Sequence, residues 1–408
     1  MWQLFAVFIA FLAIPILLKF KIKLSYVLII TALFLGIISG IGMQKLFLSL
    51  TNVFTDIASL NTILTVMMVG ILGGVMKQYG FLDKIVESLQ KLIRNRKNIL
   101  MIIPAMIGVL QIPGGAMLSA PFVNDIGKDL GIKRTKRAAI NLIFRHISMF
   151  FLPYSIHLLI IISTFPQLEL SKLVLQNSGI IASMIIIGYF LYLREAKEVK
   201  AEVRKDAEKN LLNLAIYTMP IYISVIINVI TGWPFYITLI ASVIVVYIIG
   251  DKKDFLKVVL KSINGHIVLT ITAVMLMKFV ILNMDQLLEL FDSLFSGTDN
   301  FFSILLVLFS SGLFFGMITG NNAPPLAIML PMIARLNPSI EMLYVYTYFA
   351  GAASFLGYYF SPLHLCQIFT LDIVGVTTGE LYNEYRLYAV LMLIALFGTT
   401  YMVKWIWL

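Results

Sequence analysis

The sequence predicts an all-α polytopic membrane protein with two inverted repeats of five transmembrane helices, each repeat carrying a re-entrant hairpin and an interrupted helix. Three observations lead to this fold class: an apolar composition, several hydrophobic segments of membrane-spanning length, and two longer apolar segments that are broken near the middle. Of the 408 residues, 60% are hydrophobic and 13% are charged, whereas soluble domains carry about 25% charged residues. A chain this apolar can place its surface only in lipid.

Charge and cysteine content argue against several other classes of protein. The net charge is +10, but Lys and Arg cluster in short loops between apolar segments, which orients a membrane protein and does not indicate nucleic-acid binding. Cys366 is the only cysteine, so neither a disulfide framework nor a thiolate-rich metal site is expected. The histidines show no metal-ligand spacing, and no metal or cofactor is predicted. The first apolar segment lacks the flanks of a cleavable signal and is interpreted as the first span.

Ten segments have the roughly 20 apolar residues that a transmembrane helix needs. They lie near residues 2–18, 24–44, 57–78, 138–164, 173–193, 211–231, 234–250, 263–283, 342–370 and 386–407. Two further apolar segments, 98–130 and 301–336, are broken at Pro113-Gly114-Gly115 and at Thr319-Gly320-Asn321-Asn322. Each of their arms has only about 15 residues, too few to cross a bilayer. Each segment is therefore either a re-entrant hairpin or one long broken helix.

The distribution of basic residues favours the hairpin. Lys and Arg flank the first broken segment on both sides, at 94–97 and 133–137, and cytoplasmic loops collect such residues. Both ends of the segment are therefore expected to be cytoplasmic, which only a hairpin allows. The basic loops 19–23, 194–209 and 252–261 then also lie inside. The resulting topology places both termini outside a prokaryotic-type plasma membrane.

The order of elements repeats along the chain at an offset of 205 to 207 residues, as when His157-Leu158 is matched by His364-Leu365. The first predicted repeat, residues 1–200, contains scaffold helices (1–78), a surface helix (81–94), a hairpin (98–130), an interrupted helix (138–164) and a final helix (173–193). The second, residues 201–408, contains scaffold helices (211–283), a surface helix (285–296), a hairpin (301–336), an interrupted helix (342–370) and a final helix (386–407). Because each repeat has five spans, the second copy is inverted, and a site between the copies is typical of transporters.

The hairpin tips are the predicted binding site. A tip brings the free carbonyls of one arm and the free N–H groups of the next into the membrane, where carbonyls suit a cation and N–H groups suit an anion. The predicted substrate-binding residues are Gly114, Gly115, Ser119, Gly320, Asn321, Asn322, Arg145 and His146. The predicted ion-binding residues are Pro113, Gly114, Thr319, Gly320, Asn321, Ser155 and Ser361. The alternative is that both tips are only tight turns.

Several charged and imidazole side chains lie inside predicted spans. Arg145 suits an anionic substrate and His146 a proton, although Arg145 can also extend to the cytoplasmic surface. Lys278 is expected to extend to the outer surface. His157 and His364 follow the predicted interruptions at 151–155 and 351–362, and are expected first to be buried hydrogen-bonding residues and second to act in transport. The interruptions themselves expose carbonyls for an ion, or are packing kinks.

The order of parts resembles the ion transporter superfamily, which includes divalent anion/sodium symporters, arsenite permeases and gluconate permeases. It most closely resembles an integral membrane family catalogued as domain of unknown function 401, over nearly the whole chain. The residues that carry the resemblance are Gly114-Gly115-Ala116-Met117-Leu118-Ser119-Ala120-Pro121 and Gly320-Asn321-Asn322-Ala323-Pro324-Pro325. The resemblance implies tips that bind sodium and substrate, an elevator-like transport domain and a homodimer. The Ser-Asn-Thr motif of the better-known relatives is absent.

The sequence thus predicts a secondary active transporter of a small anionic solute, coupled to a cation gradient. Sodium is favoured over the proton because neither tip holds a carboxylate, whereas both supply oxygen ligands. No Gly-x-x-x-x-Gly-Lys-Ser/Thr loop is present, so ATP is not expected to drive transport within this chain. Three alternatives stay open: a cation/proton antiporter titrating Asp125 and His146, a lipid-modifying membrane enzyme using Arg145, His146 and His157, and a channel. The expected partners are the solute, the bilayer and a second copy of the chain.

Overall fold

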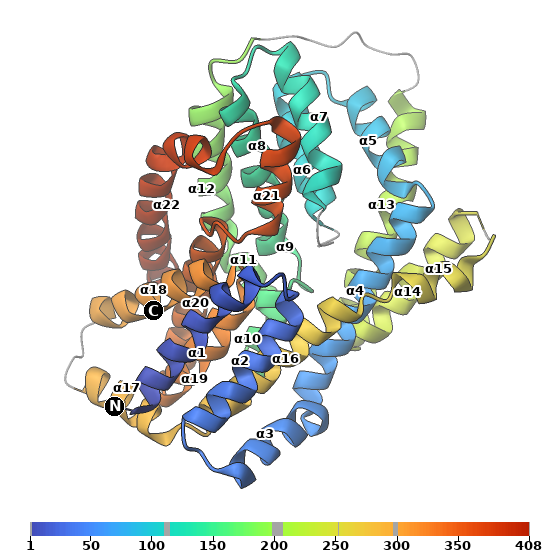
Figure 1. The fold of residues 1–408 in the computed structure, drawn as a ribbon. Coiled ribbons are helices and arrows are strands. Elements are labelled where there is room, and N and C mark those ends of the chain that lie inside the picture. The colour runs from blue at the N-terminus through green and yellow to red at the C-terminus, as the bar shows by residue number, and fades with distance from the viewer. Residues whose placement is uncertain (1, 110–114, 198–206, 252, 297–300, 408) are drawn as a thin grey trace.

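A computed structural model describes residues 2–109, 115–197, 207–251, 253–296 and 301–407 (Figure 1). All regular secondary structure in these residues is helical. Among them, 8 helices or consecutive helix groups are long and apolar enough to cross a membrane. The structure thereby confirms the predicted all-helical class and has the long apolar helices of a multi-pass membrane protein.

The first half begins with four helices, of which the second is shorter than the sequence suggests. They are α1 (Trp2–Lys19), α2 (Leu24–Ile38), α3 (Met43–Thr55) and α4 (Ile57–Gln78). The predicted span 24–44 ends at Ile38 because Gly40 and Gly42 adopt φ values of +71° and +86°, which other residues rarely adopt. The Asp56 side chain caps α4 by accepting a 2.8 Å hydrogen bond from the Ser59 backbone N–H.

The second half begins with helices in the same order, and they pack in matching pairs. They are α13 (Ala207–Thr231), α14 (Phe235–Ile249), α15 (Phe255–Ser262) and α16 (Gly265–Leu282). The Asn264 side chain caps α16, as Asp56 caps α4. Helix α2 packs against α16, and its counterpart α14 packs against α4; in the same way α3 contacts α16 and α15 contacts α4. Each contact of a first-half helix with α16 therefore has a counterpart in which the matching second-half helix contacts α4.

The two amphipathic segments form α5 (Phe81–Leu92) and α17 (Asp285–Ser296). The sequence pattern predicts that both lie flat at the membrane surface, with an ordinary connecting helix as the alternative. The apolar side of α5 is instead buried against α13, with the Phe81 ring in edge contact with the Tyr217 ring at 5.1 Å. In α17, Leu287 and Leu288 are buried as well. The apolar stripe of α5 therefore serves packing within the protein, as in an ordinary connecting helix.

Each predicted hairpin forms two helices that pack against each other. The first consists of α6 (Arg96–Gly108) and α7 (Ala116–Asp129), and the second of α18 (Phe301–Thr319) and α19 (Ala323–Arg335). Helix α18 has 19 residues and is long enough to cross a membrane, which differs from the predicted short arm. The two arms of each hairpin lie side by side in Figure 1.

Each hairpin is followed by an interrupted helix. These are α8 (Arg134–His146), α9 (Ser148–Phe151) and α10 (Ile156–Thr164), and then α20 (Ile340–Tyr359) and α21 (Leu365–Val374). The first interruption lies where it was predicted. The second begins after Tyr359 and not at Gly351, because α20 continues unbroken through its glycines. The remaining helices are α11 (Leu170–Gln176), α12 (Ser178–Gly188), extended by a π-helical turn (Tyr189–Leu193), and α22 (Thr378–Trp407).

The glycines of α18 and α20 bring these two helices into backbone contact. A Cβ atom on Gly357 would lie 2.3 Å from the Gly312 carbonyl oxygen, and one on Gly316 would lie 2.7 Å from the Tyr358 nitrogen. Small residues spaced four apart are the usual basis of such close packing between membrane helices. The contact holds the end of α18, and therefore the tip of the second hairpin, against the end of α20.

Candidate functional site

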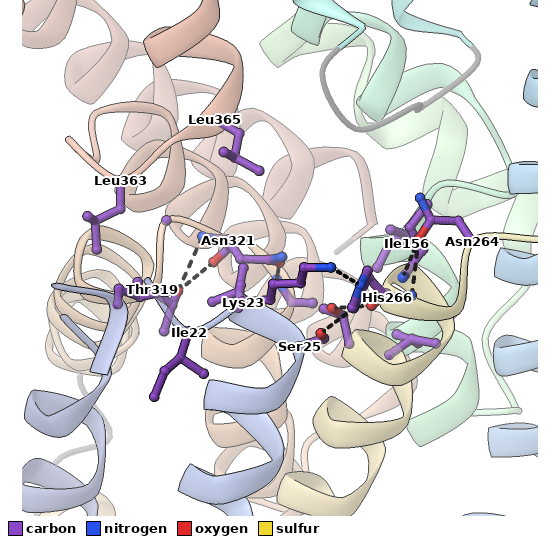
Figure 2. Close-up of a pocket in the computed structure, with 17 residues that line it drawn as sticks. Ile22, Lys23, Ser25, Ile156, Asn264, His266, Thr319, Asn321, Leu363 and Leu365 are labelled. Carbon is purple, nitrogen blue, oxygen red and sulfur yellow. Dashed lines mark hydrogen bonds between the residues drawn. The ribbon is translucent and has the colours of Figure 1, made fainter. Parts of the chain in front are cut away.

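A cavity of about 560 Å³ lies between the tip of the second hairpin, the junction of α1 and α2, and the start of α16 (Figure 2). Its wall combines three sources: the hairpin tip, the two helix interruptions and the scaffold. The lining includes Thr319, Gly320 and Asn321 from the tip, Ile156, Leu363 and Leu365 from the interruptions, and Lys23, Ser25, Asn264 and His266 from the scaffold. The described lining residues include no carboxylate.

The scaffold side of this cavity carries a positive charge. The Lys23 ammonium donates a 2.7 Å hydrogen bond to Nε2 of His266, whose Nδ1 lies 3.0 Å from the Ser25 hydroxyl oxygen. Because an ammonium group only donates, Nε2 accepts and Nδ1 carries the imidazole proton. Figure 2 shows this chain of contacts beside the tip residues Thr319 and Asn321.

The tip of the second hairpin is a compact turn whose polar groups are largely paired. The Thr319 hydroxyl oxygen lies 2.8 and 2.9 Å from the carbonyl oxygens of Phe315 and Asn321. The Asn321 side-chain oxygen accepts a 2.9 Å hydrogen bond from the Ala323 N–H. Gly320 adopts a φ of +58°. Of the predicted site residues in this turn, Thr319, Gly320 and Asn321 line the cavity, whereas Asn322 does not.

Two serine hydroxyls fasten this turn to the second interrupted helix. Ser354 donates to the Asn322 carbonyl at 2.6 Å, and Ser361 donates to the Met317 carbonyl at the same distance. Ser361 was predicted to bind an ion, but its hydroxyl also accepts from the Leu363 N–H at 3.1 Å. Its oxygen therefore has a structural role in this conformation.

Arg145 lies at the first hairpin and is buried in the protein. Its side chain is 4% exposed, so it does not extend to the cytoplasmic surface. A Cβ atom on Gly115 would lie 2.2 Å from Nη2 and 2.9 Å from Cζ of Arg145, so the guanidinium lies directly on the start of α7. Nη1 has no hydrogen-bond partner in the part of the chain that the structure describes. Among the described residues, no carboxylate lies within ion-pair distance of Arg145.

The start of α7 places a serine hydroxyl and free backbone N–H groups near Arg145. Ser119, one turn after Gly115, is completely buried, and its hydroxyl has no hydrogen-bond partner within the described ranges. The first N–H groups of a helix are free, and the helix dipole is positive at this end. The predicted site residues Pro113 and Gly114 lie outside the described residues. The structure thus brings Gly115, Ser119 and Arg145 into one region around the start of α7.

His146 follows Arg145 and faces the second interrupted helix. Its Nδ1 lies 2.6 Å from the Leu142 carbonyl oxygen, its Nε2 lies 3.3 Å from the Tyr358 hydroxyl, and its ring centre is 4.8 Å from that of His364. His364 stands between Leu363 and Leu365, which line the cavity. The second interruption therefore contributes residues both to the wall of the cavity and, through His364, to the contact with His146.

Two other sequence candidates lie elsewhere. The Ser155 hydroxyl is 3.2 Å from Nδ1 of His157, and His157 packs beside α20 near Gly351. Both side chains are buried, which fits the expected hydrogen-bonding role of His157. Asp125 is exposed on α7, so it does not share the buried position of His146.

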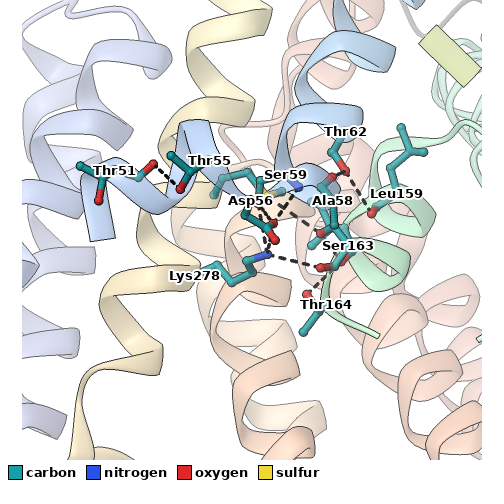
Figure 3. Close-up of polar contacts among 12 residues, drawn as sticks. Thr51, Thr55, Asp56, Ala58, Ser59, Thr62, Leu159, Ser163, Thr164 and Lys278 are labelled. Carbon is teal, nitrogen blue, oxygen red and sulfur yellow. Dashed lines mark hydrogen bonds and ion pairs between the residues drawn. The ribbon is translucent and has the colours of Figure 1, made fainter. Parts of the chain in front are cut away.

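A polar group that the sequence did not reveal joins the scaffold to the first interrupted helix (Figure 3). Lys278 of α16 is 3% exposed, which corrects the expectation that it extends to the surface. Its ammonium lies 4.0 Å from an Asp56 carboxylate oxygen, 3.4 Å from the Ser59 hydroxyl and 3.5 Å from the Ser163 carbonyl. The Thr62 hydroxyl also donates to the Leu159 carbonyl at 3.4 Å. These contacts connect α4 and α16 to the end of α10.

We expect Asp56→Asn to lower the stability of the folded protein by about 1–2 kcal/mol, because a buried ammonium loses its counter-ion while asparagine still caps α4. The exposure of Asp56 keeps the effect below that of a fully buried pair. Adding Lys278→Met should restore most of the loss, since the uncompensated charge is then removed. Thermal unfolding of the single and double variants in detergent measures this. A double variant no more stable than Asp56→Asn alone would show that the pair is energetically neutral.

Comparison with known proteins places the chain in a family. A comparison with curated proteins finds no match. The family model described as "Protein of unknown function (DUF401)" matches residues 2–403. Because this match covers nearly the entire chain, the protein belongs to the DUF401 family.

Proposed function

We propose that the protein is a secondary active transporter that moves a small anionic solute across the membrane, driven by a cation gradient. The observation that carries the proposal is the buried guanidinium of Arg145, which has no carboxylate partner among the described residues and an unpaired Nη1. An uncompensated buried charge costs several kcal/mol, so such an arginine usually faces a ligand or a water-filled path. Together with the free N–H groups at the start of α7, it offers an anion both charge and directed hydrogen bonds.

The charge of the cavity supports the same choice of solute. Lys23 and His266 line it, and none of its described lining residues is acidic. An anion entering this cavity therefore meets the positive charge of Lys23 at the scaffold. The tip of the second hairpin borders the same space and supplies the oxygen atoms that a sodium ion requires. We therefore propose sodium as the coupling ion.

Helix packing supports two inverted repeats with re-entrant hairpins as the architecture of this transporter. The exchanged pairings of α2 with α16 and of α14 with α4 are those expected if one half were rotated onto the other. We further propose that both termini lie outside a plasma membrane. The resemblance to the ion transporter superfamily adds a homodimer to the proposal.

Each half has a pocket beside its capped scaffold helix, and this pair of pockets supports alternating access. The cavity near Asn264 reaches the tip of the second hairpin. The corresponding pocket near Asp56, of about 510 Å³, is bordered by Leu159, Ser163 and Pro234. In the proposed topology the first cavity opens to the cytoplasm. An elevator-like shift of the hairpins and interrupted helices against the scaffold would open the second pocket instead.

The test is the thermal-unfolding midpoint of the purified protein across sodium, lithium, potassium, pH and a panel of small anions, followed by uptake into proteoliposomes. A ligand that binds only the folded state stabilises it by about 2.7 kcal/mol at 100 times its Kd. We expect a sodium-specific rise that increases with one class of anion, and uptake of that anion only with an inward sodium gradient. Turnover of lipid without a gradient, or currents far above carrier rates, would refute the proposal.

A cation/proton antiporter is the second candidate, and the contact between His146 and His364 favours it. The two imidazole ring centres are 4.8 Å apart, and imidazole is the side chain that takes up and releases protons near neutral pH. A midpoint that responds to pH, ignores sodium and loses its response in His146→Gln would support the antiporter. The exposed Asp125 should then be dispensable for exchange.

A further inference from the structure

His146 at the end of α8 converges with His364 and Cys366, which lie together at the start of α21. One ring nitrogen of each histidine and the Cys366 sulfur all lie within 4.8 Å of one another. Both histidines are almost fully buried, at 3% and 1% exposure. Imidazole nitrogen and thiolate sulfur are the ligands that Zn²⁺ and Cu⁺ prefer.

Backbone carbonyls orient both imidazoles for an ion. Nδ1 of His146 lies 2.6 Å from the Leu142 carbonyl oxygen, and Nδ1 of His364 lies 3.4 Å from the Tyr359 carbonyl oxygen. A carbonyl only accepts, so each Nδ1 carries the proton and each neutral ring keeps a lone pair on Nε2. Metal-bound histidines in proteins are held in this way by a second hydrogen bond. Nε2 of His364 is buried and finds no hydrogen-bond partner among the residues that the structure describes.

We propose that His146, His364 and Cys366 bind a transition-metal ion of the Zn²⁺ class through two Nε2 atoms and one thiolate. An ion equidistant from three atoms at that separation would lie at most about 2.8 Å from each, whereas Zn–N and Zn–S bonds are about 2.0–2.3 Å. Small side-chain rotations therefore suffice to close the site. The Tyr358 hydroxyl, 3.3 Å from Nε2 of His146, lies beside the position left for a fourth ligand.

The charges around the site predict how the ion binds. Arg145 acts electrostatically on both histidines and opposes a cation, whereas the Cys366 thiolate offsets one of its two positive charges. The ion would link α8 to the start of α21 and so hold the second interruption in place. Removing the guanidinium should tighten ion binding, while removing the thiolate should weaken it. The metal site and the proposed anion site therefore respond in opposite directions to Arg145→Gln.

The experiment uses the full chain in detergent with its affinity tag removed, because a histidine tag would bind the probe. Zn²⁺ is titrated while the thermal-unfolding midpoint is followed, and Co²⁺ is titrated while the thiolate-to-cobalt charge-transfer absorbance is recorded. We expect 1:1 binding with that absorbance, and protection of Cys366, the only cysteine, from a maleimide by Zn²⁺. Cys366→Ser and His364→Gln should weaken Zn²⁺ binding by about 100-fold or more, since even outer groups are worth 10–100-fold.

His157→Gln is the matched control, because His157 is equally buried and also has an unpaired Nε2 but does not belong to the cluster. It should leave Zn²⁺ affinity unchanged. Absence of a charge-transfer band and of protection in the wild-type protein would overturn the proposal, even if a variant fails to fold. An equal loss of Zn²⁺ affinity in His157→Gln would also overturn the proposal. Cys366→Ser should keep its response to the anion, so failure of the metal site and failure of the proposed transport function are distinguishable.

Discussion

Replacing Arg145 by Gln is expected to abolish stabilisation of the protein by its anionic solute and to reduce solute uptake by at least about 100-fold. Hydrogen bonds to a charged group contribute about 1.5–3 kcal/mol each, and a guanidinium makes two of them to a carboxylate or phosphate at once. The buried position of Arg145 removes the screening by water that would weaken these bonds. Uptake by Arg145→Lys should lie between that of the wild type and that of Arg145→Gln, because lysine keeps the charge but cannot make two parallel hydrogen bonds.

Although Arg145→Gln should lose uptake, its unfolding temperature without solute should not fall. In the absence of solute, Arg145 is a buried charge without a carboxylate partner among the described residues. Replacing it by a neutral side chain removes its desolvation cost, so Arg145→Gln should unfold at the same temperature as the wild type or higher. A loss of function combined with a gain in stability is the signature of a binding residue.

Arg137→Gln is the control for this experiment. Arg137 lies on the same helix, is 7% exposed and donates a 3.0 Å hydrogen bond to the Asn124 carbonyl. It should lose stability and keep its response to the solute. If Arg145→Gln lowers the unfolding midpoint and leaves uptake intact, Arg145 is a structural residue and the anion site lies elsewhere.

Replacing Gly320 by Ala is expected to disrupt the tip of the second hairpin and to reduce uptake by at least about 10-fold. The φ of +58° costs an alanine about 1–2 kcal/mol. In addition, the new Cβ would lie 2.8 Å from the backbone carbon and oxygen of Leu363, which are not free to move as a flexible side chain is. The tip must therefore separate from the second interruption, and the total cost should be about 2–4 kcal/mol.

Gly232→Ala separates the backbone cost of a positive φ from the cost of the contact with Leu363. Gly232 has a φ of +70° and no atom within 4 Å of its Cβ position, so alanine there carries only the backbone cost. It should lower stability by about 1 kcal/mol and leave uptake unchanged. Thermal unfolding and proteoliposome uptake are measured for both variants. Equal effects of the two substitutions would mean that the contact between the tip and Leu363 contributes nothing.

The sequence by itself determined the class of the protein and the positions of its turns. Apolar length and composition are properties of single segments, so α1, α4, α13 and α16 were recognisable without knowledge of their neighbours. The turns at Gly320 and at 152–155 follow from residues that cannot continue a helix. Sequence patterning also assigned a shared position to His157 and His364, one in each interrupted region.

The sequence pattern was a poor guide where one residue type can serve two structural purposes, as a glycine or an apolar helix face can. The glycines of α20 suggested an interruption from Gly351 onward, but a helix keeps its hydrogen bonds at glycine, and Gly357 serves close contact with α18. The amphipathic pattern of α5 suggested a lipid surface, but α13 covers its apolar side. Periodicity identifies an apolar face, and it does not identify what covers that face.

Only the tertiary structure decided which polar groups meet. It brings Arg145 onto Gly115, Lys278 to Asp56, and His364 and Cys366 to His146. These pairs come from different helices, and their separations along the chain follow no motif. Their contacts are set by the packing of many helices at once, in which each apolar contact contributes little and the sum selects the arrangement. A local pattern of residues contains no information about that sum.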